Sequence, residues 1–305
     1  MATHHFRANL FHNTFGSHEP VLRVAPGDTI ITELLDSGGI DAAGVQRASS
    51  PNPQTGPFFV TGAEVGDTLV VHFDAMMPNR AQGWAFDHLA PNVVDPEAVP
   101  TYSWGGRERV RATWIVDGDR VRLAETVAGI GRLELPLAPM IGAFGVAPPL
   151  AQAISTMTSG SYGGNMDYRG FRAGTTVYLP IFTPGALFMI GDGHALQGDG
   201  EISGTGIEIS FTVQFTLDIR RGGNIGWPRG EDAEWIFTVG NARPMDQALQ
   251  HATTEMLRWL GDDYQLDSRA AGLLLSSCVR YDVGNVYDPA YTIVCKLPKA
   301  VLPAR

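Results

Sequence analysis

The sequence predicts a mainly β protein, with a multi-stranded β-sandwich or barrel-like core and a few helices near the C-terminus (an α+β arrangement). Three observations support this prediction. Glycine (36 residues) and proline (20 residues) are abundant in the 305-residue chain, and both form the turns that many short strands require. Segments rich in β-branched and aromatic residues recur through the first two thirds of the chain. Helical periodicity appears only late.

Strands are expected where β-branched and aromatic residues cluster or where apolar and polar residues alternate. Two of the expected strands form a hairpin that turns at Gly118-Asp119, and two others are interrupted at Thr183-Pro-Gly. The expected strands lie at residues 21–33 (two strands), 68–75, 110–117, 120–123, 175–190 (two strands), 206–219 and 291–297.

Two helices are expected in the C-terminal part. Residues 246–260 carry an apolar stripe with four-residue spacing, formed by Ala248, Ala252, Met256 and Leu260. Gly261 is the expected C-terminal stop of this helix. Residues 268–277 predict a second helix that begins at a cap formed by Asp267 or Ser268. We therefore expect one domain over residues 1–305, with a β-rich part (1–225) and an α/β part (226–305).

Composition excludes several classes of function. The formal net charge is −10 without a cluster of Lys and Arg, which disfavours a nucleic-acid partner. No run of eighteen apolar residues predicts a membrane span, and the first residues lack the apolar core of a signal peptide. Cys278 and Cys295 are the only cysteines and lack a CxxC spacing. We expect two free thiols in a cytoplasmic protein.

The segment 191–201 carries the clearest functional pattern. Its four glycines lie among side chains suited to metal binding and acid–base chemistry, namely Asp192, His194, Gln197, Asp199 and Glu201. Asp192 and His194 are two residues apart, as are Asp199 and Glu201, and in an extended chain such pairs point to the same side. Each pair can therefore present two ligands to one point. The structural alternative is an Asx-rich turn with a satisfied histidine.

Five collinear blocks resemble the acetamidase/formamidase family. They are residues 52–67, 132–142, 145–148, 163–167 and 180–201, and the match extends more weakly toward the C-terminus. The resemblance implies a metal-dependent hydrolase that cleaves the C–N bond of small linear amides of the formamide or acetamide type. Enzymes that open small lactams also belong to the family, so the product is expected to be ammonia or an amino acid. The resemblance also implies a homo-oligomer, a dimer or a tetramer.

Amide hydrolysis explains why these residue types are needed. The reaction requires a nucleophile, a proton donor to nitrogen, and stabilisation of charge on the carbonyl oxygen. A divalent metal, above all Zn²⁺, supplies the first and the third together. We expect Asp192 and His194 to bind the metal and His194, Asp199 and Glu201 to carry the catalysis, with Glu201 as the proton shuttle.

Further metal ligands are expected from separate strands. Glu33 and Asp36 lie at the end of an expected strand, and proteins of the resembling family carry similar acids there. The alternative is that both are solvated charges at a strand end. His12 has apolar neighbours, which also suits a core histidine, and the resemblance favours a place for it in the site.

The substrate pocket is expected to involve Asn165, Asp167, Gln197 and His88. Asn165 and Asp167 follow Gly163-Gly164 with the same two-residue spacing as the pairs above. Aromatic side chains that are candidates to shape the pocket are Trp84, Phe86, Trp104 and Tyr162.

A second class of function stays open. In this alternative the chain is a non-catalytic β-rich structural or ligand-binding protein whose acids hold Ca²⁺. Calcium rarely uses histidine, so His194 favours the hydrolase, although calcium as a second ion remains compatible with it. A serine mechanism has little support because the chain has no Gly-x-Ser-x-Gly motif and its only lysines are Lys296 and Lys299.

Overall fold

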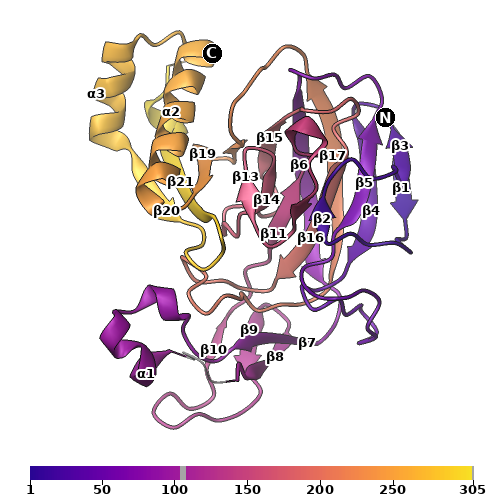
Figure 1. Cartoon of the computed structure of the whole chain (residues 1–305), viewed down its shortest axis with the longest axis vertical. Coiled ribbons are helices and arrows are strands. Elements are labelled where there is room, and N and C mark those ends of the chain that lie inside the picture. The colour runs from indigo at the N-terminus through magenta and orange to yellow at the C-terminus, as the bar shows by residue number, and fades with distance from the viewer. Residues whose placement is uncertain (104–107, 304–305) are drawn as a thin grey trace.

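Two large β-sheets face each other across an aromatic core in the computed structural model, which describes residues 1–103 and 108–303 (Figure 1). The nine-stranded sheet has the order β1 (Thr3–Phe6), β4 (Asp28–Leu34), β17 (Phe211–Arg220), β6 (Thr68–Pro78), β15 (Thr176–Pro180), β18 (Arg229–Glu231), β19 (Trp235–Ala242), β21 (Tyr291–Pro298) and β20 (Arg280–Val283). The six-stranded sheet has the order β13 (Ser159–Gly160), β14 (Gly163–Asn165), β11 (Met140–Gly145), β16 (Phe188–His194), β5 (Thr55–Val60) and β3 (Leu22–Val24).

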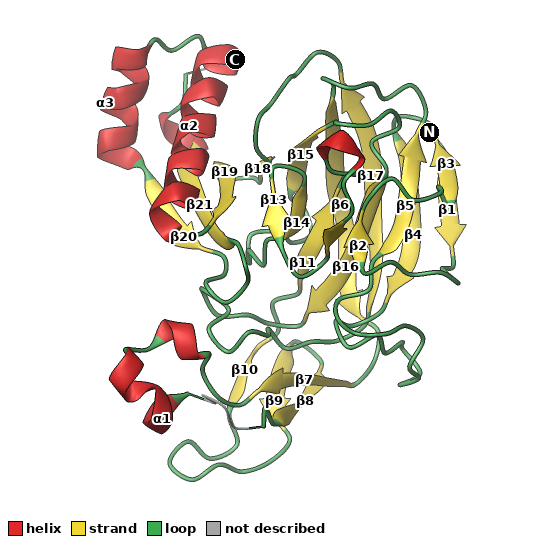
Figure 2. Ribbon diagram, viewed as in Figure 1, coloured by secondary structure: helices red, strands yellow, loops and turns green. Residues whose placement is uncertain are grey.

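Two smaller sheets complete the β structure. A four-stranded sheet has the order β10 (Glu134–Pro136), β9 (Arg120–Leu123), β8 (Arg111–Asp117) and β7 (Gln82–Phe86), and β12 (Ile154–Ser155) pairs with β2 (Thr14–Phe15). Figure 2 shows the four-stranded sheet beneath the two large sheets. The helices are α1 (Val99–Tyr102), α2 (Met245–Tyr264), α3 (Ser268–Cys278) and the 3-10 turns η1 (Pro91–Val93), η2 (Pro96–Ala98), η3 (Pro149–Ala151) and η4 (Lys299–Val301).

Phenylalanine rings from both large sheets form the centre of the core. Phe73 of β6 meets Phe144 of β11 edge to face, with ring centroids 5.2 Å apart. Phe188 of β16 meets Phe215 of β17 in the same way at 5.4 Å. All four side chains are fully buried, so burial of apolar surface holds the two sheets together at β6, β11, β16 and β17.

The prediction of a mainly β protein with helices near the C-terminus is confirmed. β1 and β20 are the two edges of the nine-stranded sheet, so within the described chain this sheet does not close into a barrel. β8 and β9 form the expected antiparallel hairpin, with Gly118 at φ 59° in its turn. The segment expected as one strand over residues 206–219 differs, because β17 begins only at Phe211 and the preceding residues cross toward the site.

Helix α2 packs its predicted apolar stripe against β19 and β21, and all four residues of the stripe are fully buried. The predicted stop at Gly261 is wrong, since the helix continues to Tyr264. The left-handed residue that ends it is Gln265 (φ 56°), whose N–H donates to the carbonyl of Leu260. The predicted cap of α3 is confirmed, because the Asp267 carboxylate accepts the N–H of Ala270 at 2.8 Å.

The described helices do not include one that combines the length and the apolar character needed to span a membrane.

Candidate active site

His194, the last residue of β16, lies at the centre of a buried carboxylate cluster. Its Nε2 is 3.0 Å from Oε1 of Glu208 and 3.4 Å from Oδ1 of Asp192. Glu208 stands opposite His194 in a β-bridge, so the two side chains share one face. The three side chains are at most 4% exposed, which means that their charges interact with little screening by water.

Gln197 fixes which nitrogen of His194 faces the carboxylates. Its side-chain N–H₂ donates to the backbone carbonyls of Asp167 at 2.5 Å and of Gly284 at 3.3 Å. Its side-chain oxygen is therefore left to accept from Nδ1 of His194 at 2.8 Å. Nδ1 carries a proton in this arrangement, and Nε2 points at Asp192 and Glu208, as in a metal-binding histidine.

The charges around Nε2 of His194 favour positive charge at this nitrogen. Burial by itself lowers the pKa of His194, but the charges of Glu208 and Asp192 outweigh burial and hold this pKa well above its usual range. Burial raises the pKa of Glu208 to about 7. Positive charge between these groups, carried by a proton or by a metal ion, is what the cluster stabilises.

A second set of buried acids lies close to His194. Burial, followed by the charge of Glu201, raises the pKa of Asp167 well above its usual range. Burial, followed by the charge of Asp288, raises the pKa of Glu201 in the same way. The pKa of Asp288 rises to about 7, again mainly through burial. Burial and mutual repulsion therefore favour the protonated form of these carboxyl groups, or a cation bound among them.

Three asparagine side chains orient the carboxylates. Asn52 donates to Asn165 Oδ1 at 2.5 Å and to Asp192 Oδ2 at 3.3 Å. Asn165 in turn donates to Asp288 Oδ2 at 2.5 Å. Asn285 donates to Asp167 Oδ2 at 3.1 Å and to Asp288 Oδ2 at 3.3 Å. The amides thus link segments from residue 52 to residue 288 into one preorganised network.

The backbone is strained at the same place. Four non-glycine residues of this network have left-handed φ angles, namely Asn52 (48°), Asp167 (46°), Asp192 (63°) and Glu201 (46°). Such conformations cost on the order of 1 kcal/mol each and concentrate at functional sites. The strain turns each acid or amide toward the shared centre.

The residues present fit a divalent metal ion. One ligand atom each from Asp192, His194 and Glu208 lie within 4.8 Å of one another, and the same holds for Asp167, His194 and Glu201. Within the described chain, the buried atoms Asp167 Oδ1 and Glu208 Oε2 have no hydrogen-bond partner. Imidazole with carboxylates is a donor set that suits Zn²⁺.

Gly142 of β11 leaves the space in which these ligands meet. A Cβ at this position would lie 2.4 Å from Asp167 Oδ1, 2.6 Å from Asp192 Oδ2 and 3.1 Å from the His194 ring. Only glycine lets the two carboxylates and the imidazole approach one another over the backbone of β11.

A cavity of about 130 Å³ opens onto this centre. Asp192, Glu201 and Glu208 line it on one side, and Trp84 and Phe86 are among the residues that line the rest. Its volume is well below the roughly 300–1,000 Å³ of pockets for drug-sized ligands. Of the other aromatic candidates, Tyr162 is buried in the core and Trp104 lies outside the described residues.

The structure gathers most of the polar residues that the sequence singled out between residues 165 and 201. Asp192 and His194 meet at one point as expected, and Asn165, Asp167, Gln197 and Glu201 lie around them. Asp199 does not join them. It is exposed and forms an ion pair with Arg169 at 2.6 Å, because Gly200 (φ 83°) and Glu201 turn the chain where an extended strand was expected.

The expected ligands from separate strands lie elsewhere. Glu33 is exposed on β4. Asp36 is fully buried but accepts from Arg80 Nη2 at 2.5 Å and from Trp84 Nε1 at 3.1 Å, which makes it a support for Trp84. His12 stacks on His18 with ring centroids 3.9 Å apart.

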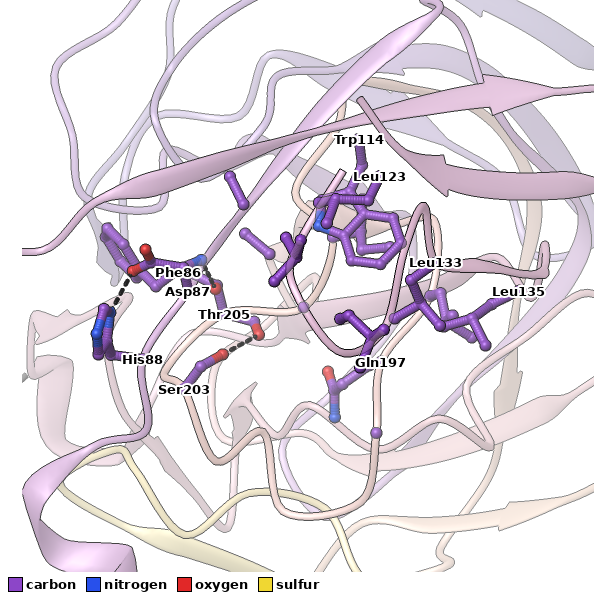
Figure 3. A pocket seen from close by; sticks show the side chains of 18 of the residues that line it. Phe86, Asp87, His88, Trp114, Leu123, Leu133, Leu135, Gln197, Ser203 and Thr205 are labelled. Carbon is purple, nitrogen blue, oxygen red and sulfur yellow. Dashed lines mark hydrogen bonds and ion pairs between the residues drawn. The ribbon is translucent and has the colours of Figure 1, made fainter. Parts of the chain in front are cut away.

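His88 also lies apart from the carboxylates. It pairs with Asp87 at 2.6 Å and lines a separate, largely apolar cavity of about 580 Å³. Figure 3 shows this cavity, with His88 and Asp87 on one side and Trp114 and Leu123 on another. Gln197 lies at its border, one hydrogen bond away from His194.

Sequence reasoning missed Asn52, Glu208, Asn285 and Asp288. Glu208 lies in the strand expected over residues 206–219, where the alternation of apolar and polar residues predicts that its carboxylate faces solvent. The structure shows why Gly206 precedes Glu208 by two residues, because a Cβ there would lie 2.5 Å from Nδ1 of His194. Asn285 and Asp288 come from a loop ninety residues downstream, and nothing in the local sequence connects them with the site.

Comparisons with known proteins identify relatives of this chain. A model of the Acetamidase/Formamidase family matches residues 145–250. The solved structure of an acetamidase from Yersinia enterocolitica is 32% identical, with a TM-score of 0.86 over 99% of this chain and 93% of that chain. An acetamidase structure from Bacillus halodurans is 29% identical, with a TM-score of 0.81 over 96% of this chain and 97% of that chain.

Among curated proteins, the acetamidase of Mycolicibacterium smegmatis is 27% identical over 240 residues, which are 72% of this chain and 56% of that protein. This chain spans about half the length of the curated relatives it matches. The fold and these likenesses define the class of protein: a relative of hydrolases that act on C–N bonds other than peptide bonds. Within that class, the chain belongs to the acetamidase/formamidase family.

Proposed function

We propose that this protein is a metal-dependent amidohydrolase that cleaves the C–N bond of small amides and releases ammonia. The observation that carries the proposal is the buried group of Asp192, His194 and Glu208 beside a cavity of about 130 Å³. The names of the similar proteins, acetamidase and formamidase, support the reaction.

The metal proposed is Zn²⁺, held by Asp192, His194 and Glu208. When bound, such an ion polarises a carbonyl group and lowers the pKa of a water molecule. Gln197 keeps the His194 lone pair aimed at the ion. His194 also separates this proposal from the calcium-binding alternative, since calcium prefers a shell of oxygens.

Glu201 is proposed as the proton donor to the leaving nitrogen. It lines the cavity, and burial together with the charge of Asp288 raises its pKa, which favours the protonated, proton-donating form. An amide nitrogen must be protonated as the C–N bond breaks, because an unprotonated amine anion is a very poor leaving group. Asn165 holds Asp288 in place by donating to its carboxylate, and Asp167 is itself held by Asn285.

The substrate proposed is a small amide, linear or a lactam, because the cavity is small and its rim is aromatic. The protein is further proposed to work in the cytoplasm as a homo-oligomer. Free Cys278 and Cys295 suit a reducing compartment. Light scattering of the purified protein tests whether it forms a dimer or a tetramer.

Ammonia release from a panel of formamide, acetamide, propionamide and 2-pyrrolidone tests the reaction. The expected result is release that stops with a chelator and returns with Zn²⁺, together with metal analysis that finds zinc. Calcium at a stoichiometric level with no hydrolysis of any amide would support the structural alternative instead.

A further inference from the structure

Two arginine side chains lie flat on two aromatic rings at the mouth of the candidate active site. The guanidinium carbon of Arg111 is 3.6 Å from the centre of the Trp84 ring, and that of Arg109 is 3.5 Å from the centre of the Phe86 ring. All four residues line the 130 Å³ cavity together with its acids. This arrangement has no role in the chemistry described above.

Strand register places Arg111 on the same face as the metal-binding group. His194 stands opposite Glu208, Glu208 opposite Trp84, and Trp84 opposite Thr113 of β8. Directly opposed residues share a face of the sheet, and Arg111 is two residues from Thr113 on the same strand. The Arg111 guanidinium lies over the Trp84 ring and lines the same cavity as Glu208.

The guanidinium is held in a fixed position. Trp84 donates from Nε1 to the fully buried Asp36 at 3.1 Å, so the ring beneath Arg111 is anchored. An ideal Cβ on Gly38 would lie 3.6 Å from Nη2 of Arg111, and the neighbouring Ser37 hydroxyl hydrogen-bonds Glu208. Residues 37 and 38 therefore lie between the Arg111 guanidinium and the carboxylate of Glu208.

Arg111 has its charge available to a ligand. Unlike Arg80, which pairs with Asp36, Arg111 has no carboxylate partner within the part of the chain that the structure describes. A guanidinium near metal-binding acids opposes cation binding, so its presence in this cavity points to a ligand that uses its charge. A planar fork held by stacking is suited to bidentate recognition of a carboxylate.

We propose that Arg111 selects amides that carry a carboxylate at the other end of a short chain, the monoamides of small dicarboxylic acids such as succinamate. This inference rests on the proposed function, since it names the substrate class of the same site. The amide group lies at His194 and Glu208, and the carboxylate meets Arg111 over Trp84. Hydrolysis forms a bond from the water oxygen to the acyl carbon, breaks the C–N bond, and yields succinate and ammonia.

The test compares kcat/KM for succinamate with kcat/KM for butyramide, a neutral amide with the same number of carbons. Both are measured on the same zinc-loaded preparation, so the fraction of active enzyme cancels from their ratio. The ratio is expected to exceed one in the wild type and to fall at least tenfold in Arg111→Met, which is about 1.4 kcal/mol. Arg111→Lys keeps the charge without the fork and is expected to recover only part of the ratio.

Arg122→Met is the matched control. It removes one guanidinium from β9 of the same sheet without lining the cavity, and its ratio is expected to equal that of the wild type. Added salt is expected to lower the ratio in the wild type and to have little effect in Arg111→Met, because an attraction between charges at the exposed mouth is screened.

Two results would overturn the inference: a wild-type ratio below one, or a ratio that Arg111→Met leaves unchanged, as a side chain that only covers Trp84 would give. If acetamide is hydrolysed in either case, the proposed function stands alone. If no amide is hydrolysed, the proposed function fails, and calorimetry of succinamate binding to wild type and Arg111→Met decides the inference separately. Binding that is lost in the variant supports it, and equal or absent binding overturns it.

Discussion

The side-chain oxygen of Gln197 accepts a hydrogen bond from Nδ1 of His194 at 2.8 Å, and the amide nitrogen of Gln197 is occupied by two backbone carbonyls. Gln197 cannot rotate its amide without losing these bonds, so it determines the tautomer of His194. The proposed metal ligand thus depends on a side chain that does not itself face the metal-binding group.

Gln197→Leu is expected to weaken metal binding by roughly 10–100-fold, which is the usual cost of losing the partner that orients a metal-binding histidine. Competition with a fluorescent chelator measures the affinity, and activity is expected to return at high zinc concentration. Gln250→Leu, on the exposed surface of α2, is the control. Wild-type affinity in Gln197→Leu would show that the hydrogen bond does not orient His194.

Glu201→Gln is expected to lower kcat by about 10²–10⁴-fold while the metal content stays near that of the wild type. The substitution keeps the size of the side chain and removes its acid. Ammonia release and metal analysis of the same sample provide the two measurements. Asp199→Asn, whose carboxylate faces Arg169, serves for comparison. Loss of zinc in Glu201→Gln would instead make Glu201 a ligand.

Gly142→Ala is expected to disrupt the site without unfolding the protein. The new Cβ would collide with Asp167 Oδ1 and Asp192 Oδ2, and both atoms must move apart from the centre. Zinc content and activity should fall together, while circular dichroism keeps the signature of a β protein. Gly198→Ala in the glycine-rich segment is the control, because its Cβ would meet nothing within 4 Å. Equal zinc content in both variants would contradict this role of Gly142.

Glu255→Ala is expected to lower the free energy of unfolding by about 3–5 kcal/mol, the cost of leaving a buried charge without its partner. Glu255 of α2 is fully buried and accepts from Nε and Nη2 of Arg229 of β18, each at 2.7 Å. Asp262→Ala removes a 65% exposed carboxylate 3.7 Å from the same arginine, and should cost no more than about 1 kcal/mol. Chemical denaturation followed by fluorescence measures both. Similar values for the two variants would refute the assignment.

The features that could be predicted from the sequence are those that depend on residues close together in the chain. The strands around β16, the apolar stripe of α2 and the Asp267 cap follow from periodicity and capping, which act within a few residues. The meeting of Asp192 and His194 belongs to the same class, because they are two residues apart.

Asp199 and Glu208 show where that reasoning ends. Asp199 has the same spacing to Glu201 as Asp192 has to His194, yet two left-handed residues turn it out to solvent. Glu208 has the alternation of a solvent-facing strand residue, yet a β-bridge to His194 buries it. Both outcomes depend on backbone conformations and pairings set by tertiary contacts that no local pattern contains.

The distribution of the acids along the chain has a consequence for biosynthesis. Asp167, Asp192 and Glu201 lie in its middle, but Asn285 and Asp288, which complete the hydrogen bonds to Asp167 and Asn165, come from the loop before β21. During synthesis, Asp167 and Glu201 therefore leave the ribosome before Asn285 and Asp288, so these hydrogen bonds form only after the loop before β21 has been made. The complete hydrogen-bonded cluster is thus a product of long-range folding, and a chain truncated before this loop is expected to lack it.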